Sequence, residues 1–282
     1  MIIGVSLGEY TRFGEEKYQK MCEHGFLAVD YDLSNTETAP YTLADKQAED
    51  FVLQEKSKIE SAGLVISQVH GPWRWPARDF TKEDRAERME KMKRSIKFTA
   101  LLGTENFVIH PIMPFGIEER LDSETAQKTW VMNVAFMSEL LETAKESGVT
   151  ICFENMPMPN FSLGTPTDVL RFVKEINDDN FKICFDTGHA VMCKEKTVGD
   201  YVRECGAEIC AFHIHDNNGF WDLHMLPYFG IIDWEDFGKA LKDIDFKGVF
   251  SFESSAYPNL SNKDYESLCK MKYNMAKQII NG

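Results

Sequence analysis

Short apolar runs recur along the chain and are separated by longer segments in which charged and apolar residues alternate. The runs are nearly continuous in Val, Ile, Leu and Phe, a pattern typical of parallel strands buried on both faces. We expect eight strands, at 2–7, 26–31, 64–69, 106–109, 149–153, 181–185, 209–214 and 249–252. Residues 81–102 and 122–147 place Lys and Glu on one face and Met, Phe, Leu and Ile on the other, which predicts amphipathic helices.

Residues at the segment boundaries support this alternation of strands and helices. Thr81 and Thr165, each followed three residues later by Asp, predict helix starts. A glycine precedes six expected strands, where a left-handed residue ends the preceding helix: Gly25, Gly63, Gly103, Gly148, Gly206 and Gly248. Eight repeats with no linker predict a single (β/α)8 TIM barrel over residues 1–282. The alternative is a doubly wound open sheet, but no Gly-x-Gly-x-x-Gly motif follows the first strand.

Composition narrows the class of protein. The 282 residues include 45 Asp and Glu against 31 Lys and Arg, a net charge of −14, which weighs against proteins that coat nucleic acids or anionic membranes. No apolar run of 18 residues and no secretory signal is visible, so we expect no membrane segment. The seven cysteines show no Cys-x-x-Cys spacing, which favours reduced thiols in a cytoplasmic protein.

Six successive expected strands end in a residue type that binds metal ions: His70, His110, Glu154, Asp186, His213 and Glu253. All strands of a parallel barrel point the same way, so these side chains should converge on the rim where barrel enzymes carry their chemistry. Any one of them could simply cap the following helix. Six ionisable groups on one rim, however, would be costly to bury without a cation or substrate, so we expect a divalent metal site.

Loop residues extend this candidate site. His189 lies three residues after Asp186, and Asp222 and His224 follow the seventh expected strand. His215 lies two residues after His213 on the same strand face and therefore competes with it as the ligand from that strand.

Several short motifs, taken in order, resemble the xylose isomerase-like TIM-barrel superfamily, which joins sugar isomerases and epimerases to the endonuclease IV family of apurinic-site nucleases. The motifs are His70-Gly71-Pro72, His110-Pro111, Glu154-Asn155, Asp186-Thr187-Gly188-His189, His213-Ile214-His215-Asp216-Asn217 and Asp222-Leu223-His224. The superfamily pattern His-x-x-Asp-Asn favours His213 over His215 as the ligand.

The resemblance implies between one and three metal ions. The isomerase branch implies one ion on Glu154, Asp186, His213 and Glu253, with Glu154 and Glu253 as the acid/base pair and His189 bonded to the substrate oxygen. The nuclease branch implies three zinc ions: on that same set, on His70 and His110 with Glu154 shared, and on His189, Asp222 and His224. Imidazole-rich sets favour zinc, whereas a single carboxylate-dominated site would also suit Mn²⁺, Co²⁺ or Mg²⁺.

Of the two branches, the sequence favours a metal-dependent isomerase or epimerase acting on a small sugar, sugar phosphate or polyol, with no nucleic-acid partner. Ketose 3-epimerases of the superfamily carry an Arg shortly after the strand-seven His, and residues 214–224 contain neither Arg nor Lys, which argues against that particular activity. The alternative is a zinc phosphodiesterase of the endonuclease IV type. Its DNA groove would have to be built from five loop cations: Arg12, Arg74, Arg78, Lys194 and Lys196. The oligomeric state is left open.

Overall fold

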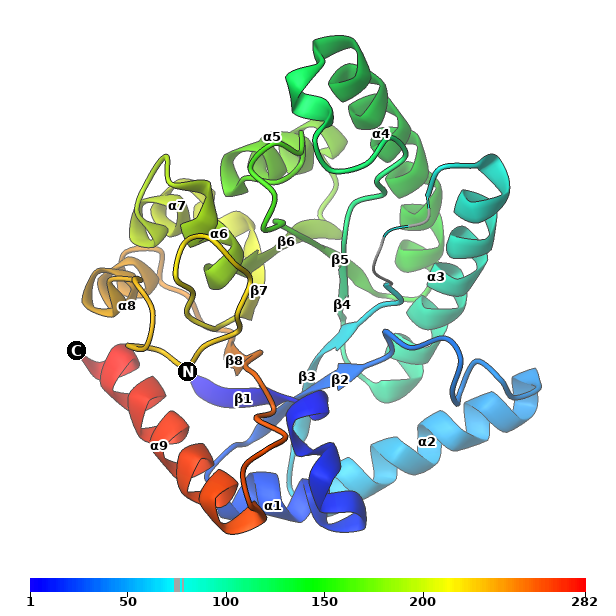
Figure 1. Ribbon diagram of the computed structural model, residues 1–282. Coiled ribbons are helices and arrows are strands. Elements are labelled where there is room, and N and C mark those ends of the chain that lie inside the picture. Colours follow the sequence, from blue (N-terminus) through cyan, green and yellow to red (C-terminus); the bar gives the residue numbers. More distant parts are fainter. Residues whose placement is uncertain (74–76, 78) are drawn as a thin grey trace.

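The computed structural model describes residues 1–73, 77 and 79–282, which form a barrel of eight parallel strands surrounded by helices (Figure 1). The strand order is β7-β6-β5-β4-β3-β2-β1-β8. The ring closes just past β7, where the Ile214 amide donates to the Ser251 carbonyl at 2.9 Å and the Glu253 amide donates to the Ile214 carbonyl at 3.2 Å. The predicted single (β/α)8 TIM barrel is therefore confirmed.

The strands lie where the apolar runs predicted them. They are β1 (Ile2–Ser6), β2 (Ala28–Asp32), β3 (Val65–His70), β4 (Asn106–Ile109), β5 (Thr150–Glu154), β6 (Phe181–Asp186), β7 (Ile209–His213) and β8 (Val249–Phe252). Several begin one or two residues later than expected and extend to include the polar residue at the end of the run, because that residue still pairs with the neighbouring strand.

Helices follow the strands as expected and form the outer layer (Figure 1). The α-helices are α1 (Lys17–Glu23), α2 (Asp45–Ser61), α3 (Lys82–Leu102), α4 (Ser123–Glu146), α5 (Pro166–Ile176), α6 (Thr187–Cys193), α7 (Val198–Cys205), α8 (Trp234–Asp243) and α9 (Asn262–Asn281), with 3₁₀ segments at Leu7–Glu16, Glu119–Leu121 and Gly206–Glu208. Thr81 caps α3 through the Asp84 amide, and Thr165 caps α5 through the Asp168 amide. No helix in the described part of the chain is long and apolar enough to cross a membrane.

One of the six boundary glycines does not adopt the predicted conformation. Five have positive φ, but Gly248 does not. The left-handed residue after α8 is Asp245 instead, with φ of 53°. An added Cβ at Gly248 would lie 2.5 Å from the Phe246 ring, so this glycine provides space for an aromatic side chain rather than a left-handed turn.

The part of the barrel interior beneath the ligand residues is lined by small side chains. Val108, Cys152, Cys184 and Ala211, one from each of β4 to β7, form a buried cluster. Each lies two residues before a predicted ligand and so points to the same face of the sheet. Outward-facing neighbours such as Phe107 and Phe153 belong to the main core packed against the helices. A narrow interior layer thus lies beneath the ligand residues.

A buried ion pair joins the two ends of the chain beside the rim. The Glu9 carboxylate pairs with Lys272 of α9, whose side chain is fully buried. Glu9 also accepts hydrogen bonds from the Ser254 amide at 2.9 Å and from the Ser254 hydroxyl at 3.0 Å. This network fixes the backbone immediately after Glu253.

Candidate metal centre

The structure brings all nine predicted ligand residues to one rim, at the carboxyl ends of the strands. His70, Glu154, Asp186 and His213 are the last residues of β3, β5, β6 and β7, and His110 and Glu253 come directly after β4 and β8. The remaining three are His189, in the first turn of α6, and Asp222 and His224, in the loop that follows β7. Their ligand atoms form adjoining groups, each compact enough to surround one ion.

The first group is made of three carboxylates and one imidazole. One ligand atom from each of Glu154, Asp186, His213 and Glu253 lies within 4.8 Å of all the others. His213 Nδ1 is 3.0 Å from Glu154 Oε1 and 3.3 Å from Glu253 Oε2. We call these four residues the carboxylate centre. It is the set that the isomerase resemblance implies.

Asp30 of β2 orients the imidazole of this centre, and sequence reasoning missed it. His213 Nε2 donates to Asp30 Oδ2 at 3.1 Å, and Gln68 Nε2 donates to the same oxygen at 3.0 Å. This contact keeps a proton on Nε2, where Asp30 accepts it in a hydrogen bond, and turns Nδ1 toward Glu154 and Glu253, as a carboxylate behind a metal-bound histidine does. The available signal was an aspartate inside the apolar run 26–31, which becomes 2% exposed on folding.

The electrostatics of the carboxylate centre fit a cation. Burial alone would raise the pKa of Glu154, but His213 and His110 outweigh it and lower that pKa well below its usual range. Glu154 Oε2 is buried yet has no well-aligned hydrogen bond among the described residues. Buried anionic oxygens need positive charge nearby, and oxygen and imidazole donors together suit Zn²⁺, Mn²⁺, Co²⁺ or Mg²⁺. A divalent ion on these four residues is consistent with the donor set.

A second group shares Glu154 with the first. His110 Nε2 lies 3.1 Å and His70 Nε2 lies 3.8 Å from Glu154 Oε2. His70 Nδ1 contacts the Gly71 carbonyl at 2.9 Å, which leaves its Nε2 toward Glu154. Burial lowers the pKa of His110 to about 4 against the opposing effect of Glu154. This imidazole therefore loses its second proton readily, as metal binding requires.

The third group contains one residue more than the resemblance implies. His189 Nε2 and His224 Nε2 each lie 3.3 Å from Asp222 Oδ2. His215 Nε2 lies 4.0 Å from Asp222 Oδ1 and belongs to the same group. We call these four residues the imidazole cluster. Of the two histidines that competed for the carboxylate centre, the structure places His213 there and His215 here.

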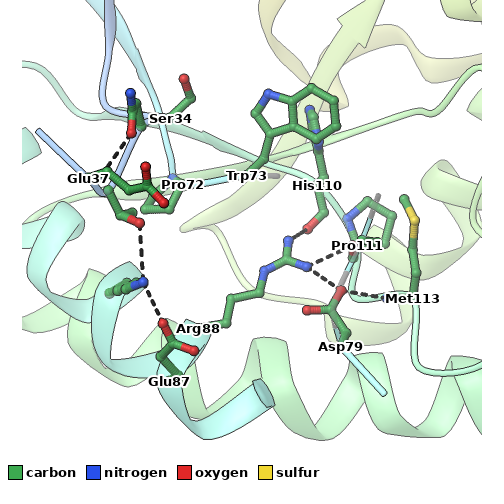
Figure 2. A pocket seen from close by; sticks show the side chains of 14 residues that line it. Ser34, Glu37, Pro72, Trp73, Asp79, Glu87, Arg88, His110, Pro111 and Met113 are labelled. Carbon is green, nitrogen blue, oxygen red and sulfur yellow. Dashed lines mark hydrogen bonds and ion pairs between the residues drawn. The ribbon is translucent and has the colours of Figure 1, made fainter. Parts of the chain in front are cut away.

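A side pocket opens next to His110 (Figure 2). Its volume is about 460 Å³, within the range of small-molecule sites, and its wall includes Trp73 and His110. Trp73 packs edge-on against the His110 ring at 5.1 Å between centroids. Arg88 donates to Asp79 at 2.6 Å and to the His110 carbonyl at 2.8 Å, so it holds the wall of the pocket together (Figure 2).

Three of the five cations expected to build a DNA groove have local partners. Arg12 donates to the Tyr257 carbonyl and stacks on Tyr265. Lys194 lies 3.7 Å from the centre of the Phe220 ring, and Lys196 pairs with Glu204 at 2.7 Å. The other two, Arg74 and Arg78, lie outside the described residues.

Fold and site together define a (β/α)8 barrel with a carboxylate- and histidine-rich rim. A family model described as xylose isomerase-like TIM barrel matches residues 19–271. The chain belongs to this family.

Proteins of known sequence and structure support this placement. The chain is 29% identical over 248 residues to an uncharacterized protein of Methanocaldococcus jannaschii, covering 84% of this chain and 77% of that protein. It is 25% identical over 205 residues to a D-psicose 3-epimerase of Ruminiclostridium cellulolyticum, covering 70% and 66%. A solved D-tagatose 3-epimerase-like protein superposes with a TM-score of 0.76 at 27% identity, covering 100% and 98% of the two chains. The zinc-bound IolI protein shares the fold, with a TM-score of 0.76 at 19% identity and 99% and 98% coverage.

Proposed function

We propose that the protein is a metal-dependent isomerase or epimerase of a small sugar, sugar phosphate or polyol. The observation that carries this proposal is the placement of Glu154 and Glu253, which both approach His213 Nδ1 from different strands of one buried rim. Two carboxylates on either side of one reacting centre are what proton removal and return require. The relatives named as sugar epimerases support the substrate class.

The pKa values of the two carboxylates shift in opposite directions, which suits the two residues to opposite roles in proton transfer. His213 and His110 outweigh burial and lower the pKa of Glu154, so it is ionised and can accept a proton. Burial raises the pKa of Glu253 above its ordinary value, so it holds a proton more readily. We assign Glu154 as the base that removes the substrate proton and Glu253 as the acid that returns one.

A divalent ion on the carboxylate centre would polarise the substrate carbonyl and make the adjacent C–H more acidic. Glu154, Asp186, His213 and Glu253 would hold it, and zinc is our first choice because so many imidazoles lie on the same rim. Mn²⁺, Co²⁺ and Mg²⁺ suit the same oxygen-rich set. The zinc named for IolI is consistent with this choice.

His189 is less suited to the substrate contact that the resemblance implies. Its Nδ1 lies 2.8 Å from the Asn155 carbonyl and its Nε2 lies 3.3 Å from Asp222, so both ring nitrogens already have partners. On the other side of Glu154, His110 lines the side pocket, and the His70 ring packs against His110 with 5.0 Å between centroids. Both imidazoles are therefore placed to contact substrate hydroxyls.

Solvent exchange tests the proposal directly. The zinc- or manganese-loaded protein is incubated in D₂O with ketoses, aldoses, their phosphates and keto-polyols, and NMR follows the loss of substrate C–H signals. We expect exchange for at least one substrate, and its loss in Glu154→Gln and Glu253→Gln. Glu235→Gln, an exposed carboxylate on α8, is the matched control and should exchange normally. Exchange that persists in Glu154→Gln would contradict the assignment.

A zinc phosphodiesterase is the second candidate, favoured by one observation: all nine ligands of the nuclease branch are present on the rim. DNA binding depends on cations that contact phosphates. Arg12, Lys194 and Lys196 already have local partners, and the chain carries a net charge of −14. We therefore rank this function below the isomerase.

A further inference from the structure

The side pocket lies beside the carboxylate centre rather than over it (Figure 2). Its wall is built from the loop after β2, the residues after β3, one face of α3 and the residues after β4, and its described lining includes none of the four residues of the carboxylate centre. A volume of about 460 Å³ can hold a small molecule by itself. The protein therefore has room for more than the group that would react at the centre.

One imidazole separates the pocket from the centre. His110 lines the pocket, and its Nε2 lies 3.1 Å from Glu154 Oε2. His110 is only 7% exposed, and its Nδ1 has no hydrogen-bond partner among the described residues. A buried nitrogen of this kind needs a partner, and a hydroxyl group can both donate and accept, so it suits either tautomer of the ring. A ligand held at Glu154 needs to pass only this side chain to enter the pocket.

Trp73 gives the pocket an aromatic wall. Its ring packs edge-on against His110, yet the residue remains 42% exposed (Figure 2). The Trp73 amide donates to the Ser34 carbonyl at 3.4 Å, which ties the loop after β3 to the loop after β2. An indole offers a broad apolar face with a polar edge, which suits the C–H groups and hydroxyls of a sugar ring.

The polar part of the wall favours a neutral ligand over an anion. Lys91 donates to Glu87 at 2.5 Å and to the Thr36 hydroxyl at 3.1 Å, and Arg88 donates to Asp79 at 2.6 Å. A phosphate would have to displace these carboxylates from their cations. Among the described residues of the lining, carboxylates also outnumber cations: Glu37, Asp79 and Glu87 against Arg88 and Lys91. Hydroxyl groups can bond to such paired charges without separating them.

We propose that the side pocket binds a second, non-reacting ring of the substrate, so that the substrate is a neutral glycoside such as a disaccharide. Its reacting unit lies at the carboxylate centre, its linkage passes His110, and its second ring packs against Trp73 with its hydroxyls toward α3. Binding of the remote ring positions the reacting unit. This inference rests on the proposed isomerase or epimerase function, because that function places the reacting unit at the centre.

Matched sugars test the second ring. The zinc-loaded protein is incubated in D₂O with fructose, with fructose 6-phosphate, and with maltulose and isomaltulose, in which a glucose ring is attached to fructose. NMR follows the exchange of substrate C–H protons. We expect kcat/KM for at least one disaccharide to exceed that for fructose by about 10-fold or more, and the phosphate to be no better than fructose.

Two variants on opposite walls of the pocket separate its role from the chemistry. Trp73→Ala should lower kcat/KM for the preferred disaccharide about 10-fold more than kcat/KM for fructose, with the difference in KM rather than in kcat. Ser34→Phe, which fills the pocket from the loop after β2, should give the same selective loss. Phe80→Ala is the matched control, because Phe80 is an exposed aromatic residue outside the described lining, and it should keep the preference for the disaccharide.

Saturation-transfer NMR reads binding apart from turnover. The glucose ring of the disaccharide should receive saturation from the wild-type protein and lose it with Trp73→Ala. If that transfer is seen but no sugar exchanges, the proposed function is wrong and the assignment of the pocket stands. If fructose exchanges but neither disaccharide binds, if the phosphate is preferred, or if Trp73→Ala keeps the preference for the disaccharide, the pocket assignment is wrong and the function stands.

Discussion

The carboxylate centre and the imidazole cluster lie side by side on one rim but have opposite compositions. The first has three carboxylates and one imidazole, and the second has one carboxylate and three imidazoles. They are joined at two points: Asp186 contacts His215, and the backbone carbonyl of Glu253 accepts from His224. A change in the imidazole cluster therefore affects two residues of the carboxylate centre.

The difference in composition indicates different roles. With all three carboxylates ionised, a divalent ion would leave the carboxylate centre with one net negative charge, which favours acceptance of a proton there. The same ion would leave the imidazole cluster, with its histidines neutral, with one net positive charge beside the carboxylate centre. The carboxylate centre is suited to proton transfer. The imidazole cluster is suited to stabilising the loop that carries it and to placing positive charge near the centre.

The largest effect should come from the residue at the heart of the carboxylate centre. Glu154→Ala removes a ligand and the proposed base together, so we expect substrate exchange to fall by about 10⁴-fold or more. The zinc content of the carboxylate centre should fall too. Exchange rates by NMR and metal content by mass spectrometry check this, and a protein that keeps full metal content at the centre would contradict it.

The buried carboxylate of Glu9 lies outside both regions and is neutralised by an amine, which extends the comparison. Lys272→Met leaves Glu9 without its cation, and we expect a loss of about 3–5 kcal/mol in the free energy of unfolding. Urea denaturation of the metal-loaded protein measures it. Lys46→Met, which removes an exposed ion pair, is the control and should cost under about 1 kcal/mol.

Asp30→Asn should affect only one of the two regions. The amide no longer offers His213 Nε2 a charged acceptor, so we expect the metal affinity of the carboxylate centre to fall by about 10–100-fold. The described contacts of Asp30 are with His213 and Gln68, not with the imidazole cluster, so the affinity of the cluster should stay constant. Zinc titration with a chelating competitor resolves the two sites; an equal loss at both would argue that the variant merely loosens the barrel.

The two regions differed in how well the sequence predicted them. Strand ends such as Glu154 and Asp186 were predictable because buried parallel strands leave a clear apolar run and all point to one rim. Asp30 was missed because it lies within such a run, where only its partner from β7 reveals its role. The place of His215 depends on Gly188, where an added Cβ would lie 1.9 Å from His215 Cε1, and on the path of residues 217–224, which periodicity does not encode. Gly248 was misjudged because the left-handed turn after α8 falls three residues earlier, at Asp245.

The pH dependence of folding stability should differ between the metal-free and the metal-loaded protein. Burial would lower the pKa values of His189 and His224, but Asp186, Asp222 and Glu253 outweigh it and raise both to about 10 without metal. These folded-state values lie above the unfolded value of about 6.5, so the stability they confer on metal-free protein is full below pH 6.5 and is lost as pH rises toward 10. Zinc must displace these protons, so the zinc-induced rise in Tm should grow from pH 7 to 9. A constant rise would contradict these pKa values.

The last prediction concerns the cleavage of DNA, for which we expect no activity. We expect no cleavage of abasic duplex DNA at about 0.15 M salt, with one, two or three zinc ions bound, because the described rim offers few free cations to a phosphate backbone. A gel assay with a radiolabelled abasic duplex tests it. Efficient cleavage that Glu154→Gln abolishes would move the function to the phosphodiesterase branch.

The contact between Gly188 and His215 means that neither position can vary by itself. A side chain at 188 first requires a smaller residue at 215, and a histidine at 215 first requires glycine at 188. Glycine at position 188 and histidine at position 215 therefore form a sequence signature that can be recognised without a structure. Chains of this family that carry both residues, together with Asp222 and His224, should form one group. Chains with a bulky residue at position 188 should lack the histidine at position 215.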